Sequence, residues 1–167
     1  SGRAGPRTVL AALVLVVGLL PFALLDLGLR PFVEPSTRLF VEDPDLGWRL
    51  RPGATDAWGG VRVRVNPRGL RGPEVAAAKP SGATRILFLG DSVTFGYGIA
   101  DDEALFASRV GAALSAAWGA PVEVVNAGVG GWAPWQQRIW LEREGLSYGP
   151  DLLVVGFVLN DVTEPLS

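Results

Sequence analysis

The sequence contains no cysteine, no histidine and no methionine among its 167 residues. The lack of cysteine excludes disulfide scaffolds, zinc ribbons and thiol catalysis, so cysteine usage says nothing about the redox compartment. The lack of histidine excludes the usual general base at neutral pH and a common metal ligand. Because the initiator methionine is also missing, we expect the chain to be part of a longer protein.

Charged side chains are scarce as well, at 19% of the sequence, whereas hydrophobic residues make up 49%. This balance excludes a disordered tail and predicts one domain with a hydrophobic core. Beyond residue 30 the chain carries 12 basic and 16 acidic side chains. An acidic domain binds a phosphate backbone poorly, so we exclude nucleic acid as the principal partner.

An uncharged, apolar segment over residues 8–25 predicts a membrane-spanning helix near the N-terminus. At about 1.5 Å of rise per residue, it covers most of a hydrocarbon core about 30 Å thick. A cleaved signal peptide is the alternative, because Arg3 and Arg7 precede the segment, but no A-x-A site ends it. We therefore predict an uncleaved membrane anchor over residues 8–29, within a first segment that spans residues 1–30.

Residues 31–84 are rich in proline, glycine and arginine and predict a small β-rich lead-in that ends in a linker. Residues 61–65 alternate valine and arginine as a half-buried strand does, and residues 46–50 are the expected partner strand. Residues 66–69 have the composition of a type I turn. Four arginines form either an anion-binding face or, as we favour, a solvated face: Arg62, Arg64, Arg68 and Arg71.

Residues 85–167 show short apolar runs that alternate with helical stretches. Strands are predicted at residues 85–90, 122–126 and 152–158, with helices between them. The order βαβαβ predicts an α/β fold class with a parallel sheet and right-handed crossovers. Residues 85–167 are therefore the expected main domain.

The ends of the two predicted helices carry sequence signals. Asp101 or Asp102 is expected to cap the first helix, and Gly119 is expected to end it. The second helix is expected to run from Pro134 to Gly145. The acidic side chains near the first helix are interpreted as caps rather than as a metal site.

Polar or glycine-rich segments follow each of the three predicted strands. Gly90-Asp91-Ser92 follows the first strand, residues 126–132 follow the second, and Asn160-Asp161 follows the third. The carboxyl ends of parallel strands meet at one edge of a sheet, so a hydroxyl, a glycine turn and an amide converge there. Acyl transfer needs a nucleophile of this kind, together with N–H donors for the oxyanion.

Together these segments resemble the SGNH or GDSL hydrolase family over residues 85–161. The resemblance implies a three-layer α/β/α, flavodoxin-like fold, of which this chain contains an incomplete copy. It implies Ser92 as the nucleophile, and an oxyanion hole formed by the backbone N–H groups of Ser92 and Gly131 and by the Asn160 side chain. It implies no cofactor and no metal. The family's Asp-x-x-His pair has no counterpart here, so we expect these 167 residues alone to have activity near background.

Residues 47–54 (GWRLRPGA) and the anchor are also similar to membrane-anchored bacterial members of that family. The resemblance implies a single-pass membrane protein with its main domain on the extracytoplasmic side, whereas the flanking charges do not decide the orientation. We expect a serine esterase that acts on a small ester or acylated glycan, with O-acetyl groups of polysaccharide or cell wall preferred. An O-acyltransferase and a non-catalytic anchored binding module are the alternatives.

A dinucleotide-binding module is a weaker alternative. The relaxed G-x-G-x-x-A pattern is matched by Gly128, Gly130 and Ala133, which follow the predicted strand at residues 122–126. However, the predicted strand at residues 85–90 comes earlier in the same domain. The nucleotide fingerprint requires the strand directly before the glycine-rich turn to be the first strand of the fold.

Several other side chains near the predicted site also have expected roles. Asp91 and Asp161 are interpreted as acceptors that order their loops, because a solvated aspartate is a poor base for a serine hydroxyl. Trp132 and Trp135 are candidates to line an acyl or sugar pocket. Trp140 is expected to pack against the sheet.

Overall fold

The computed structural model describes residues 5, 17–22, 24–25, 27, 38–76 and 78–158. The chain divides into two compact units, Ser1–Pro35 and Ser36–Ser167. No helix formed by the described residues is long and apolar enough to cross a membrane. Much of the predicted anchor over residues 8–29 lies outside the described residues, so the anchor stays a prediction.

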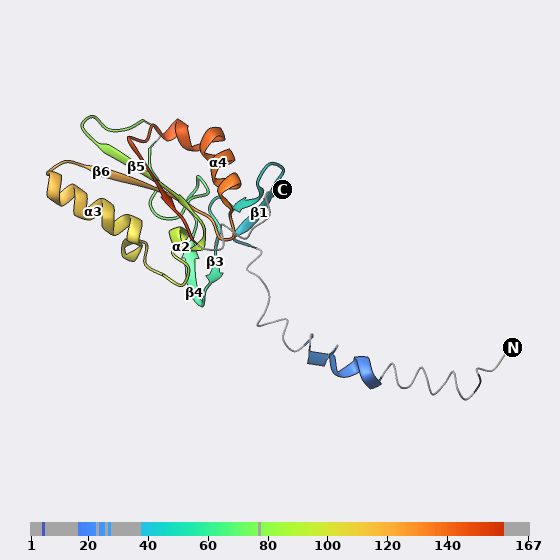
Figure 1. Ribbon diagram of the computed structural model, residues 1–167. Coiled ribbons are helices and arrows are strands. Elements are labelled where there is room, and N and C mark those ends of the chain that lie inside the picture. The colour runs from blue at the N-terminus through green and yellow to red at the C-terminus, as the bar shows by residue number, and fades with distance from the viewer. Residues whose placement is uncertain are drawn as a thin grey trace. The chain divides into compact units, whose positions relative to one another are not determined.

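A parallel sheet of three strands forms the centre of the second unit (Figure 1). In spatial order the strands are β6 (Val122–Gly128), β5 (Thr84–Gly90) and β7 (Leu152–Gly156). All residues of β5 after Thr84 are buried, because the central strand is covered on both faces. The predicted α/β class with a parallel sheet is therefore confirmed.

Helices lie on both faces of this sheet. The helix α3 (Phe106–Trp118) follows β5 and packs on β6, whereas α4 (Pro134–Arg143) connects β6 to β7 and lies on the opposite face (Figure 1). As predicted, Gly119 ends α3 in a left-handed conformation at φ 62°. Proline begins α4, where its missing N–H leaves no hydrogen bond unmade.

Two 3₁₀ turns lie beside these helices, η1 (Asp102–Ala104) and η2 (Gly145–Tyr148). The predicted cap of α3 is wrong, because the carboxylate of Asp101 accepts the N–H of Glu103 and caps η1 instead. The N-cap of α3 is Leu105, which has no side-chain acceptor. The acidic run thus stabilises a turn of its own just ahead of the helix.

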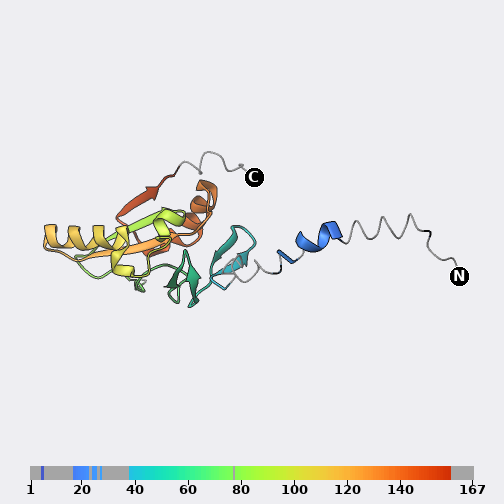
Figure 2. The same ribbon diagram turned by 90° about the horizontal axis from the view of Figure 1, so that it is seen from below.

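The β-rich lead-in forms two antiparallel hairpins, which lie side by side at one end of the sheet (Figure 2). The first pairs β1 (Phe40–Asp43) with β2 (Gly47–Leu50), and the second pairs β3 (Thr55–Trp58) with β4 (Val61–Arg64).

The predicted strand at residues 61–65 is confirmed, but its predicted partner, residues 46–50, is wrong. Gly59 and Gly60, at φ 64° and 76°, form a two-residue turn that pairs β4 with the segment just before it. Residues 47–50 pair with β1 instead. The predicted turn at residues 66–69 is confirmed by the hydrogen bond from Gly69 N–H to Asn66 O at 3.0 Å.

The hydrophobic core has one part on each face of the sheet, because alternate residues of β5 point to opposite faces. Ile86 and Phe88 face α3. Leu87 and Leu89 face α4 and belong to a larger cluster that also contains buried residues of the hairpin segment. The residues of the lead-in, residues 31–84, that belong to this cluster are Leu39, Leu46, Leu50, Val63, Val65, Leu70 and Val75. The hairpins therefore share one core with the sheet.

Candidate active site

Ser92 is the first residue of α2 (Ser92–Phe95), the short helical turn that follows β5. The Oδ1 atom of Asp91 accepts the N–H of Val93 at 2.9 Å and caps this turn. Asp91 is 2% exposed, whereas Ser92 is half-buried. The interpretation of Asp91 as a loop-ordering acceptor is confirmed.

Glycine ends each of the three strands, and the three glycines lie opposite one another in the sheet register: Gly90, Gly128 and Gly156. A Cβ at Gly128 would lie 2.6 Å from the carbonyl carbon of Thr94, and one at Gly90 would lie 2.7 Å from the Thr94 Cβ. A Cβ at Gly156 would collide with the Thr94 hydroxyl. The turn that carries Ser92 therefore packs directly on the carboxyl ends of the strands.

Asn126 joins this turn to the glycine-rich turn after β6. Its Nδ2 donates to Thr94 O at 2.9 Å, and its Oδ1 accepts the N–H of Gly128 at 3.0 Å. The N–H of Val129 also donates to Gly90 O at 3.1 Å. Sequence reasoning placed Asn126 in the second motif and missed this bridging role. An asparagine near the end of an apolar strand is the sequence signal that could have indicated it.

Backbone N–H groups are available on both turns. In the part of the chain that the structure describes, the N–H groups of Ser92 and Gly131 donate no hydrogen bond. Gly131 is exposed and adopts φ 76°, a conformation that favours glycine. Two unpaired donors at one end of the sheet are the groups that an oxyanion requires. Asn160, the third predicted donor, lies outside the described residues, as does Asp161.

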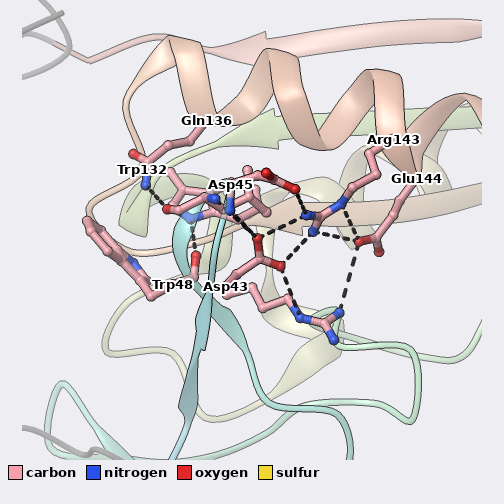
Figure 3. Close-up of polar contacts among 9 residues, drawn as sticks. Asp43, Asp45, Trp48, Trp132, Gln136, Arg143 and Glu144 are labelled. Carbon is pink, nitrogen blue, oxygen red and sulfur yellow. Dashed lines mark hydrogen bonds and ion pairs between the residues drawn. The ribbon is translucent and has the colours of Figure 1, made fainter. Parts of the chain in front are cut away.

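The first hairpin contacts the glycine-rich turn and α4 (Figure 3). Trp48 Nε1 donates to Gly130 O at 3.0 Å, and Trp132 Nε1 donates to Trp48 O at 2.8 Å. Gln136 Nε2 donates to Leu46 O at 2.6 Å. These contacts join residues more than eighty positions apart, and sequence reasoning missed the roles of Trp48 and Gln136.

An ion-pair cluster also joins this hairpin to the end of α4 (Figure 3). Arg143 donates to both carboxylate oxygens of Asp43, at 2.9 and 2.8 Å, and also contacts Asp45 and Glu144. The Arg143 guanidinium lowers the pKa of Asp43 from 3.8 to about 2, and Asp43 in turn raises the pKa of Arg143.

Residues 88–167 match the GDSL-like Lipase/Acylhydrolase family. The matched segment begins inside β5 and includes α2 with Ser92 and the whole glycine-rich turn. This GDSL-like domain therefore indicates an ester hydrolase, in agreement with the resemblance drawn from the sequence motifs. No curated protein matches the chain.

Two tryptophans of the GDSL-like domain are buried. Trp132 is 1% exposed and bonded to the hairpin, so its predicted place in a ligand pocket is wrong. Trp140 packs in the core on the face of the sheet that α4 covers, as predicted. Trp135 is half-buried.

The arginines of the lead-in do not share one face. Arg71 is buried, with Nε donating to Asp102 Oδ1 at 2.6 Å and Nη2 donating to Ile99 O at 2.7 Å. Arg62 and Arg64 are exposed on β4, and Arg68 is exposed in the turn that follows. The predicted solvation is therefore right for these three residues and wrong for Arg71.

The dinucleotide alternative is disfavoured by the packing of the glycine-rich turn. The backbone of α2 lies against Gly128, and the ring of Trp58 fills the space beside Gly130. A pyrophosphate needs the backbone of such a turn to be open to close approach.

Proposed function

We propose that the protein is a serine esterase in which the Ser92 hydroxyl attacks the carbonyl carbon of an ester. The carbonyl π electrons move to oxygen, and this oxyanion accepts hydrogen bonds from the N–H groups of Ser92 and Gly131 and from the Asn160 amide. Collapse of the tetrahedral intermediate breaks the ester C–O bond. The departing oxygen takes up the proton that a base removed from Ser92, so the alcohol leaves and the acyl group stays on Ser92 Oγ. Water then hydrolyses this acyl-enzyme.

One observation carries the proposal: unpaired N–H groups of Ser92 and Gly131 lie on two turns that Asn126 links at the carboxyl end of the sheet. Attack by serine also needs a base that removes the hydroxyl proton. The 167 residues contain no histidine, so this mechanism requires a base from outside them, and the resemblance to the SGNH family points to an Asp-x-x-His pair for that role. No metal or organic cofactor enters this mechanism.

For the substrate we propose an acylated glycan or small ester, with O-acetyl groups of polysaccharide or cell wall preferred. An extracytoplasmic domain anchored through residues 8–29 would meet such esters at the cell surface. An O-acyltransferase would form the same acyl-enzyme and pass the acyl group to a sugar hydroxyl instead of water. A non-catalytic binding module is favoured if no downstream Asp-x-x-His exists.

Hydrolysis of p-nitrophenyl acetate tests the nucleophile. We expect near-background turnover for the 167 residues and measurable turnover for a longer chain in which an Asp-x-x-His pair supplies the base. In that protein Ser92→Ala should lower turnover by roughly 10⁶-fold, and Asn160→Ala by about 10² to 10³-fold.

Ser108→Ala, a half-buried serine on α3, is the matched control and should retain parental turnover. Equal ester hydrolysis with alanine or serine at position 92 would show that another group is the nucleophile.

A further inference from the structure

The peptide that joins Gly130 to Gly131 is restrained from outside its own turn. Within the turn, the N–H of Trp132 donates to Val129 O at 3.1 Å. Glycine backbones lose more conformational freedom on ordering than other residues, so a Gly-Gly peptide needs further contacts to hold one orientation. Those contacts come from the two hairpins.

Trp48 holds one end of this peptide. Its Nε1 donates to Gly130 O at 3.0 Å, and its ring lies 3.2 Å from the position of a Cβ at Gly131. The Gly130 carbonyl and the Gly131 N–H belong to the same planar trans peptide, in which they point in opposite directions. A donor fixed on the carbonyl therefore directs the Gly131 N–H away from the indole. It also polarises the peptide, which strengthens that N–H as a donor.

Trp58 joins the glycine-rich turn to the turn that carries Ser92. Its ring fills the space beside Gly130 and packs edge-on against Phe95 of α2, with ring centroids 4.7 Å apart. Tyr97, just after α2, contacts the same indole at 5.2 Å. One side chain from β3 thus packs against both turns.

The first hairpin is itself fixed to α4. Gln136 donates to Leu46 O, and Arg143 pairs with Asp43 through two hydrogen bonds (Figure 3). Because both contacts lie at the end of the hairpin that leads into β2, adjacent to Gly47 or paired with it, Trp48 is presented to the turn from a fixed element. A rigid support of this kind is what an oxyanion donor requires to be preorganised.

We propose that Trp48 is a positioning residue that orients the Gly130–Gly131 peptide so that the Gly131 N–H faces the oxyanion. This inference rests on the proposed esterase function. It assigns the β-rich lead-in a role in catalysis, because it supplies the side chain that sets one of the oxyanion donors.

The test replaces Trp48 by phenylalanine, which keeps a ring and removes the Nε1 donor. In a longer chain that supplies the histidine, we expect kcat for p-nitrophenyl acetate to fall about tenfold, less than for loss of a whole oxyanion donor, with KM within twofold. In the 167-residue chain held in detergent, we expect the ¹⁵N and ¹H resonances of the Gly131 amide to shift, since this amide shares its peptide with the Gly130 carbonyl.

Trp118→Phe, an exposed tryptophan at the end of α3, is the matched control and should leave kcat, KM and the Gly131 amide unchanged. If Trp48→Phe leaves the Gly131 amide unshifted, or raises KM with kcat unchanged, Trp48 does not position the peptide and the proposal is wrong. If Trp48→Phe does not fold, 3-benzothienylalanine at position 48 replaces the indole N–H by sulfur and preserves the ring shape. The Gly131 amide resonances, kcat and KM of that variant then test the proposal.

The two proposals fail in different ways. If the esterase proposal is wrong, the parent and Ser92→Ala proteins will have equal activity. If the positioning proposal is wrong, the Gly131 amide resonances will be unchanged in Trp48→Phe, and these resonances can be measured without any catalytic activity.

Discussion

Gly128 lies where the backbone of α2 meets the end of β6, and atoms already occupy the space for a side chain there. A Cβ would lie 2.6 Å from the Thr94 carbonyl carbon and 2.9 Å from the Phe95 Cα. Both neighbours are backbone atoms, so they move only if the whole turn moves. The place of Ser92 therefore depends on a residue in another strand.

Gly128→Ala is expected to lower the free energy of unfolding by about 1–3 kcal/mol, because the added methyl group displaces α2. Urea denaturation followed by circular dichroism measures this change. Gly82→Ala is the control, since its Cβ meets no atom within 4 Å and its cost comes from the positive φ of 76° alone. Equal stability of Gly128→Ala and the parent would mean that α2 adjusts without strain.

At the scale of elements, the first hairpin and α4 are held together by an ion pair whose carboxylate is buried and whose guanidinium is partly exposed. The Asp43 side chain is 7% exposed, and Arg143 makes hydrogen bonds to both of its oxygens. The pKa of Asp43 falls to about 2 in the folded protein, from 3.8. A lowered carboxylate pKa stabilises the folded state above pH 4, and this stabilisation is lost as the pH falls through 2.

Asp43→Asn is expected to remove this pH-dependent stabilisation. The parent protein should lose about 1–2 kcal/mol more stability than the variant between pH 4.5 and pH 2, a value reduced because Arg143 is partly exposed. Urea denaturation across this range measures the difference. Glu142→Gln disrupts an exposed pair on the same helix and should follow the parent curve. Parallel curves for Asp43→Asn and the parent would exclude a role for this ion pair in stability.

At the scale of the whole molecule, β7 is an edge strand in the part of the sheet that the structure describes. Its side chains are apolar and exposed, with Val155 at 52% and Phe157, just beyond the strand, at 62%. Long apolar edges template pairing with other chains.

Residues 36–167, prepared without the N-terminal unit, are therefore expected to form oligomers or aggregates at micromolar concentration. Val155→Lys should increase the monomer fraction several-fold, because a lysine on an edge strand opposes pairing. Size-exclusion chromatography with light scattering measures this fraction. Val110→Lys, at a 39% exposed position on α3, is the control. A monodisperse parent that melts cooperatively would contradict the role assigned to the edge.

The candidate site could be predicted in part because its signals are local. Asp91 and Ser92 follow a buried apolar run, and the glycine-rich turn follows another, so their place at the strand ends can be inferred from sequence. The pairing of the second hairpin also has a local signal, a Gly-Gly pair of the kind that forms two-residue turns, but the prediction missed it. This pairing depended on Gly59 and Gly60, whose turn geometry outweighed the apolar pattern of residues 46–50.

The sequence by itself determined the α/β class, the order of the strands along the chain and the motif that carries Ser92, because periodicity and turn residues act over a few positions. The tertiary structure decided how the β-rich lead-in is used. Trp48 and Gly130 are 82 positions apart, and no local pattern predicts that an indole will meet a carbonyl across that separation. That contact forms because the lead-in and the sheet bury a shared core, which brings the hairpin against the glycine-rich turn.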